Sequence, residues 1–303
     1  MTRPNLFLIG HPRSGTGTID GQLQQHPDIY MANKELHYFG SDLFYNSPPR
    51  SLENYLQYFP TTKTTTYIGE SSTWYLASNT AADEIYRFSP DAKIILSLRN
   101  PVDWLYSLHS HMVYAAYEDT KDFAQALAKE EDRINGNIPE NAYPPMGVCY
   151  KSLVQYTSQV QKYWDVFGKE NVLVILFDDL KKKPEETLNK TLEFLGLPQN
   201  FPNRQQAVSG SKKQKNANHG HRSSRLHHWI KSGRRRAILH GTREESIPGS
   251  RLFIRALHRL NTTSKERAPM DKNLRKSLVS EFLPQVESLE TVLNVDLTSW
   301  KDS

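Results

Sequence analysis

Residues 5–18 read NLFLIGHPRSGTGT, and this stretch is the strongest indication of the fold class. Asn5–Gly10 is an apolar run of the length of a buried strand, and the residues after Thr18 (IDGQLQQHP) indicate a helix that ends at Pro27. The segment Gly10–Thr18 therefore connects a strand to a helix. Its glycines let the backbone approach an anion closely, and the amino end of the following helix favours negative charge.

This segment is predicted to bind a phosphate-like group through main-chain amides, hydroxyl groups and one guanidinium. The candidate residues are Arg13, Ser14, Gly15, Thr16, Gly17 and Thr18. The Gly-x-x-x-x-Gly spacing resembles a Walker A loop, but Thr16 stands where that motif has Lys. A nucleoside triphosphatase is therefore disfavoured.

Further apolar runs alternate with helical patterns along the chain. Strands are predicted at residues 66–69, 93–98 and 172–177, and helices at 81–88, from 100 onward, at 150–167, from 184 to 196 and from 271 onward. Such alternation predicts a P-loop-like α/β fold, in which a parallel β-sheet is flanked by helices on both faces. We expect a single domain over residues 1–303.

Composition narrows the function classes. The 303 residues carry 38 Lys and Arg against 33 Asp and Glu, and a net charge of +5 is too small to indicate a nucleic-acid binder. One cysteine, Cys149, excludes both an intrachain disulfide and a Cys-rich zinc site. No apolar run is long enough to span a membrane and no signal-peptide pattern is present, so we expect a cytoplasmic protein without a membrane partner. The oligomeric state stays open.

Residues 201–270 differ in composition from the rest of the chain. No Asp or Glu occurs from Phe201 through Arg243, and basic residues are frequent there. We expect a basic, mobile excursion on the domain. Its Arg234–Arg236 cluster is interpreted as a solvated surface or a flap, with binding of an acidic polymer as the alternative. Its histidines follow no metal-binding spacing, and no metal is expected.

A second anion site is predicted where the strand at residues 93–98 ends. Arg99 follows that strand, and Ser107 lies eight residues further along, about two turns into the next helix. Ligands of open α/β sheets bind at the carboxyl ends of strands. An Arg here, where a metal-dependent phosphotransferase usually has Asp, favours a phosphate held without metal. The alternative is that Arg99 only pairs with a carboxylate such as Asp103.

The two segments together resemble the paired phosphate-binding elements of the sulfotransferase superfamily, whose donor is 3′-phosphoadenosine 5′-phosphosulfate (PAPS). Residues 34–39 (KELHYF) are similar to the Lys-Glu-x-His-Phe-Phe segment of the bacterial and heparan-sulfate-type branches. The resemblance extends over almost the whole chain, because three further segments are also similar to the family: Asp178–Leu180, Leu195–Leu197 and Asp296–Trp300. It implies that the first element binds the 5′-phosphosulfate and the second binds the 3′-phosphate.

The resemblance also implies residue roles. Glu35 is the expected base, and His37 is the alternative base or its partner, because both point to one side if the segment is extended. Arg13 replaces a common catalytic Lys and can act only electrostatically, which leaves the general acid open; Lys34 is a weak candidate for it. Glu70, followed by Ser71 instead of a common Lys, is expected to be supportive. Asn216 and Arg222 are candidate donor contacts in a loop that closes over the adenine and 3′-phosphate.

The leading hypothesis is a PAPS-dependent sulfotransferase of EC 2.8.2 type. It would move a sulfuryl group in line to a hydroxyl or amine of a small-molecule or sugar acceptor, releasing adenosine 3′,5′-bisphosphate (PAP), as a tailoring enzyme of bacterial natural-product metabolism. One alternative is a magnesium-dependent phosphotransferase with Asp178 or Asp179 as metal ligand. The other is a non-catalytic binder of acidic polymers. The identity of the acceptor is not readable.

Overall fold

The computed structural model describes residues 2–32, 35–43, 51–59, 65–210, 217–223, 226, 257 and 259–302. Its strands are β1 (Leu6–Gly10), β2 (Ile29–Met31), β3 (Tyr67–Ser71), β4 (Lys93–Leu98), β5 (Val172–Leu176), β6 (Ala217–His221) and β7 (Thr262–Glu266). Its α-helices are α1 (Thr16–Leu23), α2 (Leu52–Leu56), α3 (Ala81–Phe88), α4 (Pro101–Tyr114), α5 (Phe123–Ala128), α6 (Glu130–Ile134), α7 (Tyr156–Phe167), α8 (Phe177–Lys182), α9 (Pro184–Phe194), α10 (Arg204–Gly210), α13 (Lys272–Leu293) and α14 (Thr298–Lys301). Short 3-10 helices are η1 (Thr73–Ala77), η2 (Pro145–Val148), η3 (Lys151–Leu153) and η4 (Lys169–Asn171).

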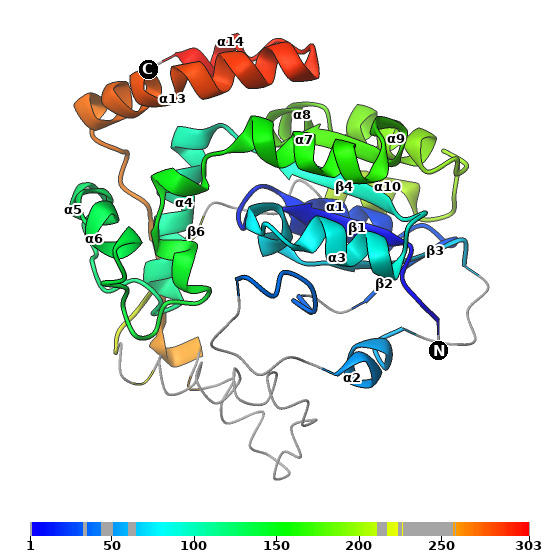
Figure 1. Cartoon of the computed structure of the whole chain (residues 1–303), viewed down its shortest axis with the longest axis horizontal. Helices are drawn as coiled ribbons and strands as arrows, with labels where there is room; N and C mark the ends of the chain where they lie inside the picture. The colour runs from blue at the N-terminus through cyan, green and yellow to red at the C-terminus, as the bar shows by residue number, and fades with distance from the viewer. Residues whose placement is uncertain are drawn as a thin grey trace.

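A five-stranded sheet in the order β2-β3-β1-β4-β5 forms the centre of the molecule (Figure 1). All its neighbouring strands are parallel, as the alternation of strands and helices predicts. The central strand β1 pairs with β3 on one side and with β4 on the other. Because Gly10 lies opposite Ser97, the loop after β1 and the chain after β4 leave the sheet side by side at the same edge.

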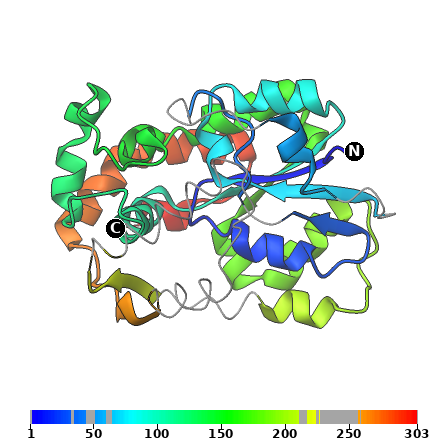
Figure 2. The same ribbon diagram turned by 90° about the horizontal axis from the view of Figure 1, so that it is seen from below.

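Helices cover both faces of the sheet, which confirms the predicted fold class (Figure 2). Alternate residues of β1 serve the two faces. Leu6 and Leu8 belong to a core cluster with residues of α1, α8 and α9, whereas Phe7 and Ile9 belong to a second cluster with residues of α3, α4, α7 and α13. Burial on both faces explains why β1 and β5 are apolar throughout and why β4 has the apolar centre Ile94–Leu96.

Several predicted boundaries were wrong: the strand predicted at 66–69 is β3 at Tyr67–Ser71, and the helix predicted to end at Pro27 is α1, which ends at Leu23. The helix expected from Tyr150 begins only at Tyr156, because the main-chain amides of Lys151 and Ser152 donate to the buried Glu130 carboxylate instead of entering a helix. The strand expected to reach Phe177 ends one residue earlier, where α8 begins.

The basic excursion contains regular structure that its composition did not indicate. Its described part includes α10, which packs on α1, and an antiparallel pair of strands, β6 and β7. Strand β6 also contacts α4. The Arg234–Arg236 cluster lies outside the described residues.

Candidate active site

The loop between β1 and α1 adopts a fixed, unusual backbone. Arg13 and Gly15 both have positive φ, at 72° and 99°. A Cβ on Gly15 would lie 2.8 Å from Phe177 Cδ2 and 2.9 Å from Leu180 Cδ2, so position 15 requires glycine for space as well as for conformation. The indole Nε1 of Trp104 donates to the carbonyl oxygen of Pro12 at 2.8 Å, which attaches the loop to α4.

His11 fastens the same loop to α7. Its ring is fully buried between Trp104 and Tyr156, with centroids 4.4 and 5.7 Å away, and its Nε2 lies 3.0 Å from Gln159 Oε1. Gln159 donates through Nε2 to the Leu153 carbonyl, so its Oε1 is the acceptor and His11 Nε2 carries the proton. Burial lowers the pKa of His11 to about 4, which keeps the imidazole neutral.

The loop presents several donors that nothing else uses. Gly15 is the N-cap of α1 and no side chain caps the helix, so the first amides of α1 lack intrahelical acceptors. Ser14 Oγ is buried and has no hydrogen-bond partner among the described residues. Amides at a helix amino terminus together with a hydroxyl are the groups that bind phosphate or sulfate.

The structure brings the two predicted anion-binding elements together. Arg99 Nη1 donates to the carbonyl oxygen of Arg13 at 3.0 Å, and Arg13 Nε lies 3.5 Å from Ser107 Oγ. The Arg99 guanidinium also stacks on the Phe177 ring at 4.7 Å. The Asp103 carboxylate accepts its hydrogen bond from Arg275 Nη1 at 2.7 Å and attracts Arg99 through its charge.

A third arginine, Arg267, joins this pair, and sequence reasoning did not find it. It follows β7 and its guanidinium lies over the Tyr106 ring at 4.3 Å. Burial lowers the pKa of Arg13, and the charge of Arg267 lowers it further. Burial likewise lowers the pKa of Arg99; the charge of Asp103 raises it, and the charges of Arg267 and Arg13 lower it further. Three cations that repel one another form a site for an anion with more than one charge.

Glu35 and His37 form a pair at the carboxyl end of β3. His37 Nε2 lies 3.0 Å from Glu35 Oε2, and the two side chains are 15% (His37) and 36% (Glu35) exposed. The segment is not extended at His37, which has a φ of 47°. The contact arises from this left-handed turn and not from the alternation of a strand. Because β3 neighbours β1, the pair and the loop lie at the same sheet edge.

The other candidates lie elsewhere. Asn216 and Lys34 fall outside the described residues. Arg222 follows β6 at the end that pairs with Thr262, whereas Arg267 adjoins the opposite end of the hairpin, about 16 Å away along the strand. The structure does not join Arg222 to the arginine cluster, and its donor contact stays a prediction.

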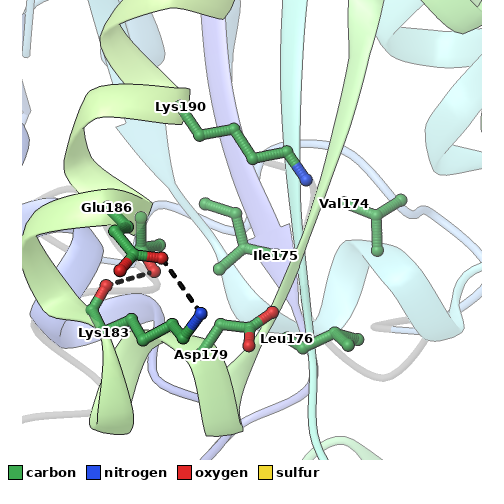
Figure 3. A pocket seen from close by; sticks show the side chains of 8 residues that line it. Val174, Ile175, Leu176, Asp179, Lys183, Glu186 and Lys190 are labelled. Atoms are coloured by element: carbon green, nitrogen blue, oxygen red, sulfur yellow. Dashed lines mark hydrogen bonds and ion pairs between the residues drawn. The ribbon is translucent and has the colours of Figure 1, made fainter. Parts of the chain in front are cut away.

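Asp178 and Asp179, the metal ligands of the phosphotransferase alternative, both lie in α8 and have other contacts. Asp178 accepts a hydrogen bond from Trp300 Nε1 at 2.6 Å. Asp179 lines a groove of about 180 Å³ between β5 and helices α8 and α9, where Lys183 pairs with Glu186 (Figure 3). Among the described residues, neither carboxylate is hydrogen-bonded to the loop after β1, so the geometry gives no support to a magnesium-dependent phosphotransferase.

A family profile described as a sulfotransferase domain matches residues 3–242. The chain belongs to the sulfotransferase family. This sulfotransferase superimposes on the crystal structure of a sulfotransferase from Alicyclobacillus acidocaldarius with a TM-score of 0.70 and 27% identity, over 100% of both chains. The family resemblance predicted from the sequence is thereby confirmed.

Curated relatives of this sulfotransferase are larger proteins. A bifunctional heparan sulfate N-deacetylase/N-sulfotransferase 1 of Caenorhabditis elegans is 25% identical over 207 residues, 66% of this chain and 22% of that protein. A membrane-associated sulfotransferase, kil1, of Dictyostelium discoideum is 32% identical over 273 residues, 64% of this chain and 56% of that protein. The chain thus spans between about a fifth and about half of these relatives.

Neither a membrane-spanning helix nor a metal site occurs among the described residues of the sulfotransferase. In the part of the chain that is described, no helix combines the length and apolarity needed to cross a membrane. Within the same residues, no group of three or more His, Cys, Asp or Glu side chains is placed to hold a metal ion.

Proposed function

We propose that this sulfotransferase transfers a sulfuryl group from PAPS to a hydroxyl or amine of a small-molecule or glycan acceptor, within a single domain. The observation that carries the proposal is the convergence of Arg13, Arg99 and Arg267 beside the uncapped helix α1. PAPS carries two separated anionic groups on one nucleoside, and the loop and the arginine cluster match that requirement.

The donor would be held at two points. Amides of residues 15–17 and the Ser14 hydroxyl suit the 5′-phosphosulfate. Arg99, Arg267 and Ser107 suit the 3′-phosphate, because planar guanidinium groups bind phosphate oxygens in pairs. No metal is required in this proposal, since the protein's own cations neutralise the donor. Asn216 and Arg222 remain candidates for further donor contacts.

The chemical step needs a base and a stabilised leaving group. Glu35 accepts the proton of the acceptor hydroxyl or amine, while His37 orients that carboxylate or takes the proton in its place. The acceptor atom forms a bond to sulfur as the bond from sulfur to the bridging phosphate oxygen breaks. PAP leaves with that electron pair, and Arg13 stabilises the charge that develops on it. Arg13 supplies no proton at neutral pH.

The proposed class of acceptor is based on the names of similar proteins. The curated relatives include proteins named for heparan sulfate N-sulfation, which supports a sugar hydroxyl or amine as one acceptor class. A small metabolite is the other class, and we propose a cytoplasmic tailoring role in bacterial metabolism. The family membership supports the reaction type more strongly than it supports either acceptor.

The test is transfer of radiolabelled sulfate from PAPS in the presence of EDTA. Glucosamine-containing oligosaccharides and simple phenols serve as probe acceptors, and mass spectrometry detects the added SO₃ group. We expect transfer by the wild-type protein and its loss in Glu35→Gln, with PAP still bound. Absence of transfer to every probe together with absence of PAP binding would contradict the proposal.

A further inference from the structure

The four consecutive main-chain amides of residues 36–39, next to Glu35, donate hydrogen bonds to two side-chain hydroxyl groups. The amides of residues 36 and 37 both donate to Ser72 Oγ at 3.1 Å. The amides of residues 38 and 39 donate to the Tyr75 hydroxyl oxygen at 2.8 and 3.2 Å. This places the whole stretch from Leu36 to Phe39, including the left-handed His37, under the control of two side chains.

Both hydroxyls in turn donate a hydrogen bond to the same carboxylate. Ser72 Oγ donates to Glu70 Oε2 at 3.0 Å, and the Tyr75 hydroxyl donates to Glu70 Oε1 at 3.1 Å. Tyr55 adds a third O–H to Glu70 Oε1 at 2.9 Å. An ionised carboxylate only accepts hydrogen bonds, so it directs every hydroxyl hydrogen toward itself and leaves the hydroxyl lone pairs for the amides.

Burying the Glu70 carboxylate to accept these hydrogen bonds costs folding free energy. Its side chain is 1% exposed, and no Lys or Arg of the described part of the chain forms an ion pair with it. Burial raises the pKa of Glu70, while the three O–H donors and the charge of His37 act in the opposite direction. A buried carboxylate held by neutral donors is unfavourable for folding at neutral pH, which points to a role in activity.

We propose that Glu70 is a positioning residue for the catalytic pair, an inference that rests on the proposed function of that pair. By orienting the hydroxyls of Ser72 and Tyr75, Glu70 fixes the backbone of residues 36–39 and so holds Glu35 and His37 in contact. It does not touch the acceptor itself, because it lies behind the segment and is enclosed by Tyr55, Ser72 and Tyr75.

The network distinguishes a carboxylate from an amide of the same shape. In Glu70→Gln the side-chain NH₂ would face either Ser72 or the two tyrosines. The hydroxyl next to the NH₂ group would then face another hydrogen-bond donor. Its own hydrogen, which the Glu70 carboxylate accepts in the wild type, would have no acceptor. The volume of the side chain is unchanged, so the variant tests the direction of the hydrogen bonds and not the packing.

Glu84 provides a matched control. It anchors the same segment further on, where its carboxylate accepts from the amide of Gly40 at 2.7 Å and from Ser41. The carbonyl oxygen of Gln can still accept the Gly40 amide, and the hydrogen bonds to Ser41 are exposed and replaceable by water, so Glu84→Gln should leave residues 36–39 unchanged. Ser72→Ala is the second test variant, because it removes the acceptor of two amides while Glu70 stays in place.

The experiment combines hydrogen exchange of residues 36–39, followed by mass spectrometry, with PAP calorimetry and transfer kinetics using PAPS and a probe phenol. In Glu70→Gln we expect exchange at least ~10-fold faster and kcat ~10- to 100-fold lower, with the KM for PAPS and the Kd for PAP within about twofold. Ser72→Ala should act in the same direction, and Glu84→Gln should match wild type. Loss of donor affinity in parallel with kcat would indicate general unfolding and would overturn the proposal.

The two proposals fail in different ways. If wild type transfers sulfuryl groups and neither Glu70→Gln nor Ser72→Ala changes exchange or kcat, positioning by Glu70 is wrong and the proposed function stands. If wild type transfers nothing and binds no PAP, the proposed function fails. The exchange data then decide separately whether Glu70 fixes residues 36–39.

Discussion

Replacing Arg267 by Gln should weaken PAP binding without destabilising the unliganded protein. Arg267 adds a third positive charge next to Arg13 and Arg99 and lowers the pKa of both. In the unliganded protein its removal relieves this repulsion, which offsets the loss of its attraction to Asp103 and of its cation–π contact with Tyr106, the latter worth about 0.5–1 kcal/mol at an exposed site. The unliganded melting temperature should therefore change by no more than a few degrees.

The effect on the ligand should be much larger. A hydrogen bond between a charged donor and a phosphate contributes about 1.5–3 kcal/mol, so the Kd for PAP should rise about 10- to 100-fold. At a PAP concentration of about 100 times the wild-type Kd, binding stabilises the wild-type protein by about 2.7 kcal/mol. With a 30-fold weaker Kd, the same concentration stabilises the variant by about 0.9 kcal/mol.

Calorimetry gives the Kd, and thermal melting with and without PAP gives the stabilisation. Lys151→Gln is the control, because it removes a positive charge from a surface ion pair with Glu281 and leaves the cluster intact. It should bind PAP like wild type. An unchanged Kd in Arg267→Gln, or an equal loss in both variants, would refute the assignment of Arg267 to the donor site.

Three further predictions concern the pair, the loop and pH. Glu35→Gln should lower kcat ~100- to 10,000-fold while calorimetry shows unchanged PAP affinity; full activity would move the base to His37. Gly15→Ala forces a Cβ against Phe177 at a φ of 99° and should lower both melting temperature and PAP affinity, by about 1–3 kcal/mol in stability; a wild-type melting curve would contradict it. His11, with a pKa of about 4 when folded against 6.5 when unfolded, binds protons less well in the folded state. Stability should therefore fall by about 3 kcal/mol as pH drops from 6.5 through 4, and urea unfolding of His11→Gln should show a flatter pH profile.

The sheet and the loop after β1 could be predicted from the sequence because their patterns lie within short stretches of the chain. Residues 6–10 and 94–96 are continuous apolar runs, as expected of strands covered on both faces. Asn100 caps α4 with its side chain and Pro101 occupies the first turn, so the helix that carries Ser107 could be placed from two residues. The spacing of Arg99 and Ser107 then follows from helix geometry.

The rest of the site depends on contacts between distant segments. Arg267 reaches Arg13 and Arg99 only through the β6–β7 hairpin, whose polar sequence gives no strand pattern. The left-handed turn at His37 is fixed by Ser72 and Tyr75, more than thirty residues away. The start of α7 was misplaced for the same reason, since Glu130 takes the amides that would have begun the helix earlier.

A crystal structure of the protein grown with PAP and EDTA would show whether one nucleotide joins the loop after β1 to the arginine cluster. We expect the 5′-phosphate on the amides of residues 15–17 and the 3′-phosphate between Arg99 and Arg267, with Glu35 facing the 5′-phosphate end. Density for PAP in the groove beside β5, or a 3′-phosphate that contacts neither arginine, would contradict it.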